Sequence, residues 1–528
     1  MKNVTRISRQ KLQGKTRGRM RLGLLKTKSN SRNLNSLSHP KSPIIHEFSR
    51  RGPRKTFKLW VVSFAAFLAA WLGMFSASMA ADLQWGGLYR FEGVRVNNAE
   101  LDGKNTDKAY MLHHLVMKPK IVAADGVTIF GRFDLLNNST VGMNNQVGEF
   151  IGKGVGTGTP TNAGNSNVIS RQQESGGLAV TQMYMSWAQE FGQLIVGRAP
   201  LHFGLGTSYN SGAEAFDHYF TTLDMVSYKV IAGNFFIMPI LGKVNEGSLN
   251  REDDVNDYIL HFQYDNPETD LSMGLMYAVR VGTGNDIPVN NSYYGGTGST
   301  RVGDYKHNLI SLFSSQRLGA STVGVEAQIL SGDTGVRTTS GTDVKLNAFA
   351  VAAEVDWKPE TGPWSADVKL GFVSGDDPGS QDTHEGFVFS QNYRVGTLMF
   401  QHPLGRADFF RTGMVRDTTT AASTHVNDEA VSNVLYLAPT VHYRQSDTWS
   451  YFGRVLTARL NKDPIQNSNT NSDLGYELDF GMEWRPFDRL QWVTEIGALL
   501  PGEAWKGGTS AFDNKVVYGI QTKAAIHF

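Results

Sequence analysis

Apolar and polar residues alternate with a period of two along several segments of the chain. In Leu474–Arg485 every even position is apolar, whereas every odd position is Gly, Glu, Asp or Arg. Successive side chains of a β-strand point to opposite faces, so such a segment predicts a strand with one apolar and one polar face. The pattern recurs in Leu83–Glu92, Leu271–Arg280, Trp364–Phe372, Leu490–Ala498 and Val516–Phe528.

The connections between these segments alternate between short and long. Eight short turns are expected at Asp125-Gly126, Phe191-Gly192, Gly233-Asn234, Asn266–Thr269, Arg317–Ala320, Glu360–Pro363, Asp447-Thr448 and Phe487-Asp488. Nine longer polar stretches separate them, near Asn97–Asp107, Asn138–Gly177, Thr207–Thr222, Glu246–Asp254, Thr283–Asp304, Gly332–Asp343, Asp376–Glu429, Lys462–Asp473 and Pro501–Asn514. Eight turns and nine loops connect 18 strands.

This organisation predicts an all-β fold for residues 81–528: a transmembrane antiparallel up-and-down β-barrel of about 18 strands, with short periplasmic turns and long extracellular loops. A soluble β-sandwich would show the same alternation. The even strand count, the alternating loop lengths and tryptophans near strand ends favour the barrel, because aromatic girdles mark membrane interfaces. These tryptophans are Trp85, Trp187, Trp357, Trp364, Trp449, Trp484 and Trp492.

Residues 1–80 have the pattern of an exported protein's leader. A basic n-region, residues 1–58, precedes an apolar h-region, residues 59–75, and small residues around Ala80 suit a cleavage site. The n-region is unusually long, so either the true start lies downstream of Met1 or the leader is atypical. An uncleaved membrane anchor is the alternative. We expect the mature barrel to lie in the outer membrane of a Gram-negative bacterium.

The charge balance supports the same division. Residues 1–58 carry 17 Lys and Arg and one acidic residue, whereas the remainder carries 34 basic and 48 acidic residues, a net charge of −14. Such an acidic barrel domain offers no basic surface for nucleic acid. The chain has no cysteine, which excludes a disulfide scaffold, a thiolate zinc site and a cysteine nucleophile.

An 18-stranded barrel is wide enough to leave an aqueous channel. Charged side chains on the lipid face are costly, so alternation assigns them to the lumen, as solute contacts or as structural ion pairs. The residues predicted to line the pore are Arg90, Glu92, Arg132, Asp134, Arg198, Arg280, Asp367, Lys369, Arg454, Glu477, Asp479, Glu483 and Glu495.

The segment Asp376–Glu429 is too long for a simple connection and is rich in aromatic residues. We expect it to fold into the lumen as a pore-constricting loop; an outer cap or an additional hairpin, which would raise the strand count to 20, are the alternatives. Its candidate constriction residues are Asp376, Asp377, Arg394 and Arg411.

Short motifs resemble those of the alginate-export family of outer-membrane barrels. They are the Gly-Asp-Asp-Pro sequence at Gly375–Pro378 with its aromatic continuation, the segment Leu474–Asp479, and Glu495–Ala498 followed by Pro501-Gly502. Gly197-Arg198 also looks like the Gly-Arg strand of several substrate-selective porins. The resemblance implies an 18-stranded barrel with an arginine-rich conduit for an acidic polysaccharide. The C-terminal Phe528 resembles the aromatic residue that such barrels present to the assembly machinery.

The sequence contains no Walker loop, HExxH or GxSxG motif, and it predicts neither an enzyme nor a cofactor or metal site. The predicted function is an outer-membrane porin through which small polar or anionic solutes diffuse, with outer-membrane lipid around it and no nucleic-acid partner. Export of an acidic polysaccharide and a plugged barrel acting as a surface adhesin are the alternatives. The oligomeric state stays open.

Overall fold

A computed structural model describes residues 81–99, 101, 107–136, 149–150, 178–245, 255–282, 304–337, 342–377, 379–380, 382–402, 404, 430–463, 471–506 and 515–528. The 18 long strands are β1 (Asp82–Val96), β2 (Lys108–Ala124), β3 (Val127–Leu135), β5 (Ala179–Gln189), β6 (Gly192–Pro200), β7 (Thr222–Ala232), β8 (Phe235–Asn245), β9 (Val255–Asn266), β10 (Leu271–Gly282), β11 (Tyr305–Leu318), β12 (Ser321–Arg337), β13 (Asp343–Trp357), β14 (Trp364–Val373), β16 (Val434–Arg444), β17 (Trp449–Leu460), β18 (Asp473–Phe487), β19 (Leu490–Pro501) and β20 (Val517–His527). Two strands of two residues, β4 (Glu149–Phe150) and β15 (Thr383–His384), and one 3-10 helix, η2 (Glu503–Lys506), complete the described elements. None of the helical structure within these ranges is long and apolar enough to cross a membrane.

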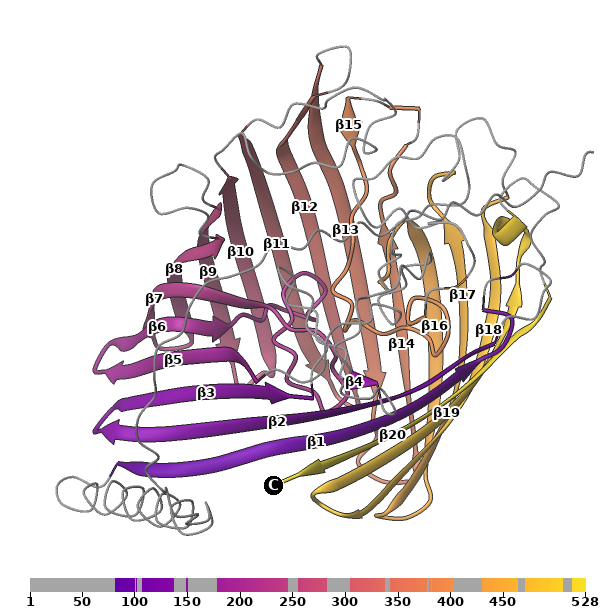
Figure 1. Cartoon of the computed structure of the whole chain (residues 1–528), viewed down its shortest axis with the longest axis horizontal. Coiled ribbons are helices and arrows are strands. Elements are labelled where there is room, and N and C mark those ends of the chain that lie inside the picture. Colours follow the sequence, from indigo (N-terminus) through magenta and orange to yellow (C-terminus); the bar gives the residue numbers. More distant parts are fainter. Residues whose placement is uncertain are drawn as a thin grey trace, which may run out of the picture. The chain divides into compact units, whose positions relative to one another are not determined.

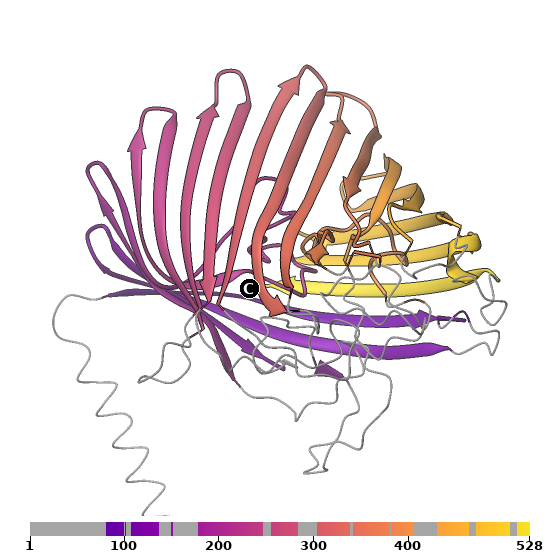
Figure 2. The ribbon, with the colours of Figure 1, turned by 90° about the horizontal axis from the view of Figure 1, so that it is seen from above.

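The long strands form one closed sheet. Each pairs antiparallel with the next long strand in the chain, and β1 pairs with β20 from Leu88 opposite His527 to Val96 opposite Gly519. The indigo β1 and the yellow β20 lie side by side in both views (Figure 1, Figure 2). Closure gives each of the 18 long strands two hydrogen-bonded neighbours. The prediction of an 18-stranded antiparallel barrel is confirmed.

The strand ends confirm all eight short turns. The turn between β2 and β3 shows why its residues are needed: Gly126 has φ +77°, and a Cβ there would lie 2.8 Å from the carbonyl oxygen of Ala188. Only glycine adopts such a backbone conformation without strain. A long connection joins β1 to β2, so Asp82, at the other end of β1, lies at the barrel end that carries the short turns. Because β20 runs antiparallel to β1, its last residue, His527, lies at the same end.

The outer wall is apolar. On β18 the side chains of Tyr476, Leu478 and Phe480 are each at least half exposed, whereas Glu477 and Asp479 between them are buried. An exposed apolar wall around a closed barrel is the arrangement that suits lipid, since the backbone polar groups are all paired within the sheet. The alternation in the sequence therefore separates the lipid face from the interior, and the chain folds as an outer-membrane type of barrel.

The seven tryptophans named above gather at one end of this wall. Each lies within six residues of a short turn or of the β1 terminus, which is at the same end. Trp449, Trp484 and Trp492 are cross-strand neighbours, and the rings of Trp449 and Trp484 stack with centroids 5.8 Å apart. Their position indicates an aromatic girdle at the membrane interface on the short-turn side.

The largest buried core lies inside the barrel, between the wall and the segment that connects β14 to β16. Phe389, Leu398 and Met399 of this segment pack with small wall residues such as Ala350 of β13 and Ala458 of β17. Alternation predicts a polar inner face, but the inner wall near the long-loop ends of β13–β20 is largely apolar. The reason is that this part of the wall contacts protein instead of water.

Candidate functional site

Two of the connections that the structure describes enter the barrel interior. The first is residues 201–221, between β6 and β7, which reach β12 on a distant part of the wall. There the carboxylate of Glu326 accepts hydrogen bonds from the backbone N–H of Leu205 (2.7 Å) and the hydroxyl of Ser208 (3.2 Å). The ring of Phe203 packs edge-on against that of Phe313 on β11, with centroids 6.4 Å apart. The alternation of short turns and long loops predicts a long outer loop at Thr207–Thr222; the structure instead places this segment inside the barrel.

The second inward connection is the described part of 374–404. The Glu477 carboxylate on β18 accepts backbone hydrogen bonds from Thr397 and Leu398 (both 2.6 Å) and from Met399 (2.7 Å). The Leu398 side chain lies against Gly519 of β20, where a Cβ would clash with it. The lack of a side chain on the wall thus makes room for the loop. This part of the expected constriction segment lies in the interior, whereas Arg411 lies outside the described residues.

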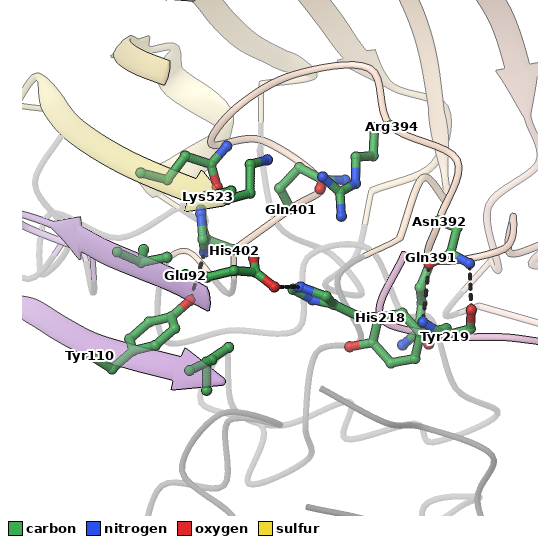
Figure 3. A pocket seen from close by; sticks show the side chains of 13 residues that line it. Glu92, Tyr110, His218, Tyr219, Gln391, Asn392, Arg394, Gln401, His402 and Lys523 are labelled. Carbon is green, nitrogen blue, oxygen red and sulfur yellow. Dashed lines mark hydrogen bonds and ion pairs between the residues drawn. The ribbon is translucent and has the colours of Figure 1, made fainter. Parts of the chain in front are cut away.

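The two connections are hydrogen-bonded to each other. The backbone N–H of Ser390 donates to the carbonyl of Thr207 (2.6 Å). The Asn392 side chain donates to the Tyr219 carbonyl (2.6 Å) and accepts from the Tyr219 N–H (3.1 Å), as Figure 3 shows. We call these joined segments, residues 201–221 and 374–404, the inner layer. A side-chain amide that pairs with both backbone groups of one residue fixes the register between the two halves.

A small pocket lies between the inner layer and the wall formed by β1, β2 and β20. It has a volume of 30 Å³, enough for about one or two water molecules. We call it the central pocket. Its acidic, basic and histidine lining residues are Glu92, His218, Arg394, His402 and Lys523 (Figure 3). Three of these come from the inner layer and two from the wall, so the pocket exists only when the layer is docked.

Glu92 is the acceptor at the centre of this pocket. Its carboxylate takes 2.6 Å contacts from Arg90 Nε and from His218 Nε2. Arg90 also donates to the backbone carbonyl of Asp217 (2.6 Å), and Arg394 donates to the carbonyl of Phe216. Arg90 of the wall and Arg394 of the inner layer therefore bind neighbouring carbonyl groups, those of Asp217 and Phe216, and hold this stretch in place.

The histidines of the pocket are neutral at ordinary pH. Burial lowers the pKa of His218 to about 4; the negative charge of Glu92 opposes this shift, and the positive charge of Arg90 adds to it. Burial and the positive charge of Lys523 lower the pKa of His402 to about 3. Because Glu92 can only accept when ionised, neutral His218 carries its proton on Nε2. Burial has the opposite effect on Asp217, whose pKa is raised.

A second buried charge cluster lies beside the first, on β2, β3 and β5. Asp134 accepts from Arg132 Nη2 (3.1 Å) and from the hydroxyl of Thr181, and His114 Nε2 lies 2.9 Å from the same carboxylate. The Arg132 guanidinium lies over the Phe220 ring of the inner layer, 4.5 Å from its centroid. The structure thus joins two predicted pore residues, Arg132 and Asp134, in one ion pair under the loop.

The other predicted pore residues form pairs along the wall. Arg198 pairs with Asp224, Arg280 with Asp257, Asp367 with His442, Lys369 with Glu354, Arg454 with Asp479, Glu483 with Arg485, and Glu495 with Lys523. Of the candidate constriction residues, Asp376 contacts His384 and Asp377 contacts Lys462. Among the members of that set that the structure describes, only Arg394 lines the central pocket.

Several residues of the site are not among the pore-lining residues predicted from the sequence. Lys523 occupies one of the alternate positions of the last strand that carry polar side chains, so the alternation could have assigned it to the interior. Glu326 has a similar signal on β12. Nothing in the local sequence marks His218 or His402, because their position depends on where two long connections fold.

Comparison with models of known protein families gives no match, and comparison with curated proteins gives none either. The fold of this chain is similar to solved structures of porins. OccK9 of Pseudomonas aeruginosa has a TM-score of 0.47 and 11% identity, over 85% of this chain and 98% of that one. OccK2 of the same species, in complex with glucuronate, has a TM-score of 0.46 and 11% identity over the same shares. A BenF-like porin from Pseudomonas fluorescens also has a TM-score of 0.46, 11% identity and the same coverage.

Proposed function

We propose that the protein is an outer-membrane channel of a Gram-negative bacterium through which small polar or charged solutes diffuse. One observation carries the proposal: two long connections fold into a barrel of 18 strands and meet in a layer whose edge is lined by charged side chains. A barrel of this size without such a layer would be a wide aqueous pore. An inward layer that contacts the charged wall converts that pore into a narrow polar path.

The charges along the path define how solutes would be discriminated. Arg394 and Lys523 face the central pocket together with Glu92, while Glu495 pairs with Lys523 at 2.7 Å. Opposite charges at one level of a channel create a transverse field that orients polar solutes. Most of these groups are already paired, so a passing solute exchanges hydrogen bonds with a preorganised set and is not held tightly.

The narrow central pocket favours small solutes over the export of an acidic polysaccharide. A volume of 30 Å³ holds only about one or two water molecules, so a small solute requires a local shift of the inner layer, whereas a polymer would require the layer to move away from β1 and β20 and stay away while the chain passes. A plugged adhesin barrel shares the docked layer but would not conduct.

Planar-bilayer recording of the purified, folded protein tests the proposal. We expect discrete ohmic steps in 1 M KCl. A variant in which residues 391–401 are replaced by a short Gly-Ser linker should give larger steps, because these residues include Arg394 and carry the backbone contacts to Glu477. Lack of conductance in both proteins would reject the channel and favour the adhesin. Equal step sizes would reject the inner layer as the determinant of the path.

A further inference from the structure

A second cavity, separate from the central pocket, lies on the inner wall of β6–β10 near the long-loop end. It has a volume of 280 Å³ and is bounded by Leu201, Tyr209 and Thr221 of the inner layer and by charged residues of the five strands. Small-molecule sites begin at about this size, so the cavity can hold a solute of amino-acid dimensions.

The charged residues form a row of alternating sign. They are Arg198 of β6, Asp224 of β7, Lys243 of β8, Asp257 of β9 and Arg280 of β10. Each is the third residue from the long-loop end of its strand. Arg198 faces Asp224, Asp224 faces Lys243, and Asp257 faces Arg280 in the strand register. Neighbouring strands are about 4.8 Å apart, which sets the spacing of the charges along the wall.

Only one of the two carboxylates is accessible from the cavity. The Asp224 side chain is 48% exposed, as is that of Arg198, whereas the Asp257 side chain is 3% exposed beneath Arg280. Arg198 binds Asp224 with two parallel contacts of 2.7 and 2.8 Å, which fixes both groups in place. A solute therefore meets an acceptor, Asp224, between the cations Arg198 and Lys243 on the adjoining strands.

This sequence of charges discriminates against simple ions. An anion attracted by Lys243 or Arg198 is repelled by Asp224 between them, and a cation attracted by Asp224 is repelled on both sides. A solute that carries an ammonium group next to a carboxylate matches the row, since each of its charges has an opposite charge on an adjacent strand. The hydroxyl groups of Thr221 and Tyr209 add neutral polar contacts, and burial raises the pKa of Tyr209 to about 12.

We propose that this cavity is a binding site for small zwitterions of the α-amino-acid class, with the ammonium group on Asp224 and the carboxylate at Lys243 or Arg198. The biological role of the site rests on the proposed channel function. Binding of a solute to the site does not, because binding does not require conduction.

Saturation-transfer NMR on the detergent-solubilised full chain tests the site with three probes of similar size. Alanine carries both charges, propionate only the carboxylate, and ethylamine only the ammonium group. We expect alanine to bind at least about fivefold more tightly than either of the others. Equal affinity for alanine and propionate would overturn the zwitterion assignment.

Variants separate the site from general effects. Asp224→Asn should weaken alanine binding about tenfold, because a charged hydrogen bond is lost, and leave propionate binding unchanged or tighter. Asp224→Glu should restore most of the preference. Asp270→Asn is the matched control, since Asp270 pairs with Arg317 at a short turn on the opposite barrel end. An unchanged alanine-to-propionate ratio in a folded Asp224→Asn protein would reject the site. Failed binding with normal conductance would reject this inference alone, whereas normal binding without conductance would reject the channel alone.

Discussion

The carboxylate of Glu477 on β18 accepts a hydrogen bond of 2.6 Å from the backbone N–H of Leu398 in the inner layer. The same carboxylate also accepts from Thr397 and Met399, so three consecutive N–H groups converge on one buried anion. A buried carboxylate without such donors would be strongly destabilising. The contact therefore explains both why a charged residue is tolerated on this wall and why the loop stays inside.

The first prediction concerns this contact. Glu477→Gln keeps the shape but removes the charge and one acceptor, and should weaken docking of residues 396–399 by about 1–3 kcal/mol. We expect increased current noise and faster protease cleavage within 382–402.

Glu483→Gln is the control for this experiment. Glu483 lies on the inner face of the same strand but contacts Ser450, Arg485 and Gln491 instead of the inner layer. If the Glu477 and Glu483 variants gave the same current noise, Glu477 would not be the anchor.

A second prediction concerns charge selectivity. Neutralising Arg394, Arg198 or Arg454 removes a positive charge from the interior, so each substitution to Gln should shift the permeability ratio towards cations. Arg394 should have the largest effect because it faces the central pocket. The measurement is the reversal potential in a KCl gradient. Arg317→Gln, at a short turn, is the control, and an unchanged reversal potential for all three variants would argue against their role in the lumen.

A third prediction concerns pH. A solvent-exposed histidine has a pKa of about 6.5, whereas those of docked His218 and His402 are about 4 and about 3. Between about pH 6.5 and 4 the undocked layer binds more protons than the docked layer, so acidification favours release of the layer. The raised pKa of Asp217 acts in the opposite direction at the acidic end of this window.

Current recordings between pH 7.5 and 4.5 measure this effect. Channel openings or noise should increase as the pH falls, and the double substitution His218→Gln with His402→Gln should flatten the dependence. A pH response that is identical in the double variant would show that other groups control the layer.

A fourth prediction concerns the lipid face. Leu478 is half exposed in the middle of β18, so Leu478→Arg should destabilise the barrel by about 2–4 kcal/mol in a bilayer. Leu318 is also exposed but lies at the end of β11 beside a short turn, and Leu318→Arg should cost about 0–1 kcal/mol. Urea unfolding in lipid vesicles measures both. Equal costs would contradict the assigned position of the membrane.

The sequence by itself determines the strands, the turns and the two faces of the wall. Alternation around Tyr476–Asp479 and the turn at Gly126 are local properties: the pleat sends neighbours to opposite sides, and a positive φ favours glycine. An apolar outer wall requires an apolar residue at every second position of a strand, so the pattern can be recognised without a structure. The tertiary structure alone decides what fills the barrel. The contacts of Glu477 with Leu398, of Glu92 with His218 and of Asn392 with Tyr219 join residues between 79 and 173 positions apart. No local pattern encodes them, because each depends on where a long connection meets a distant wall.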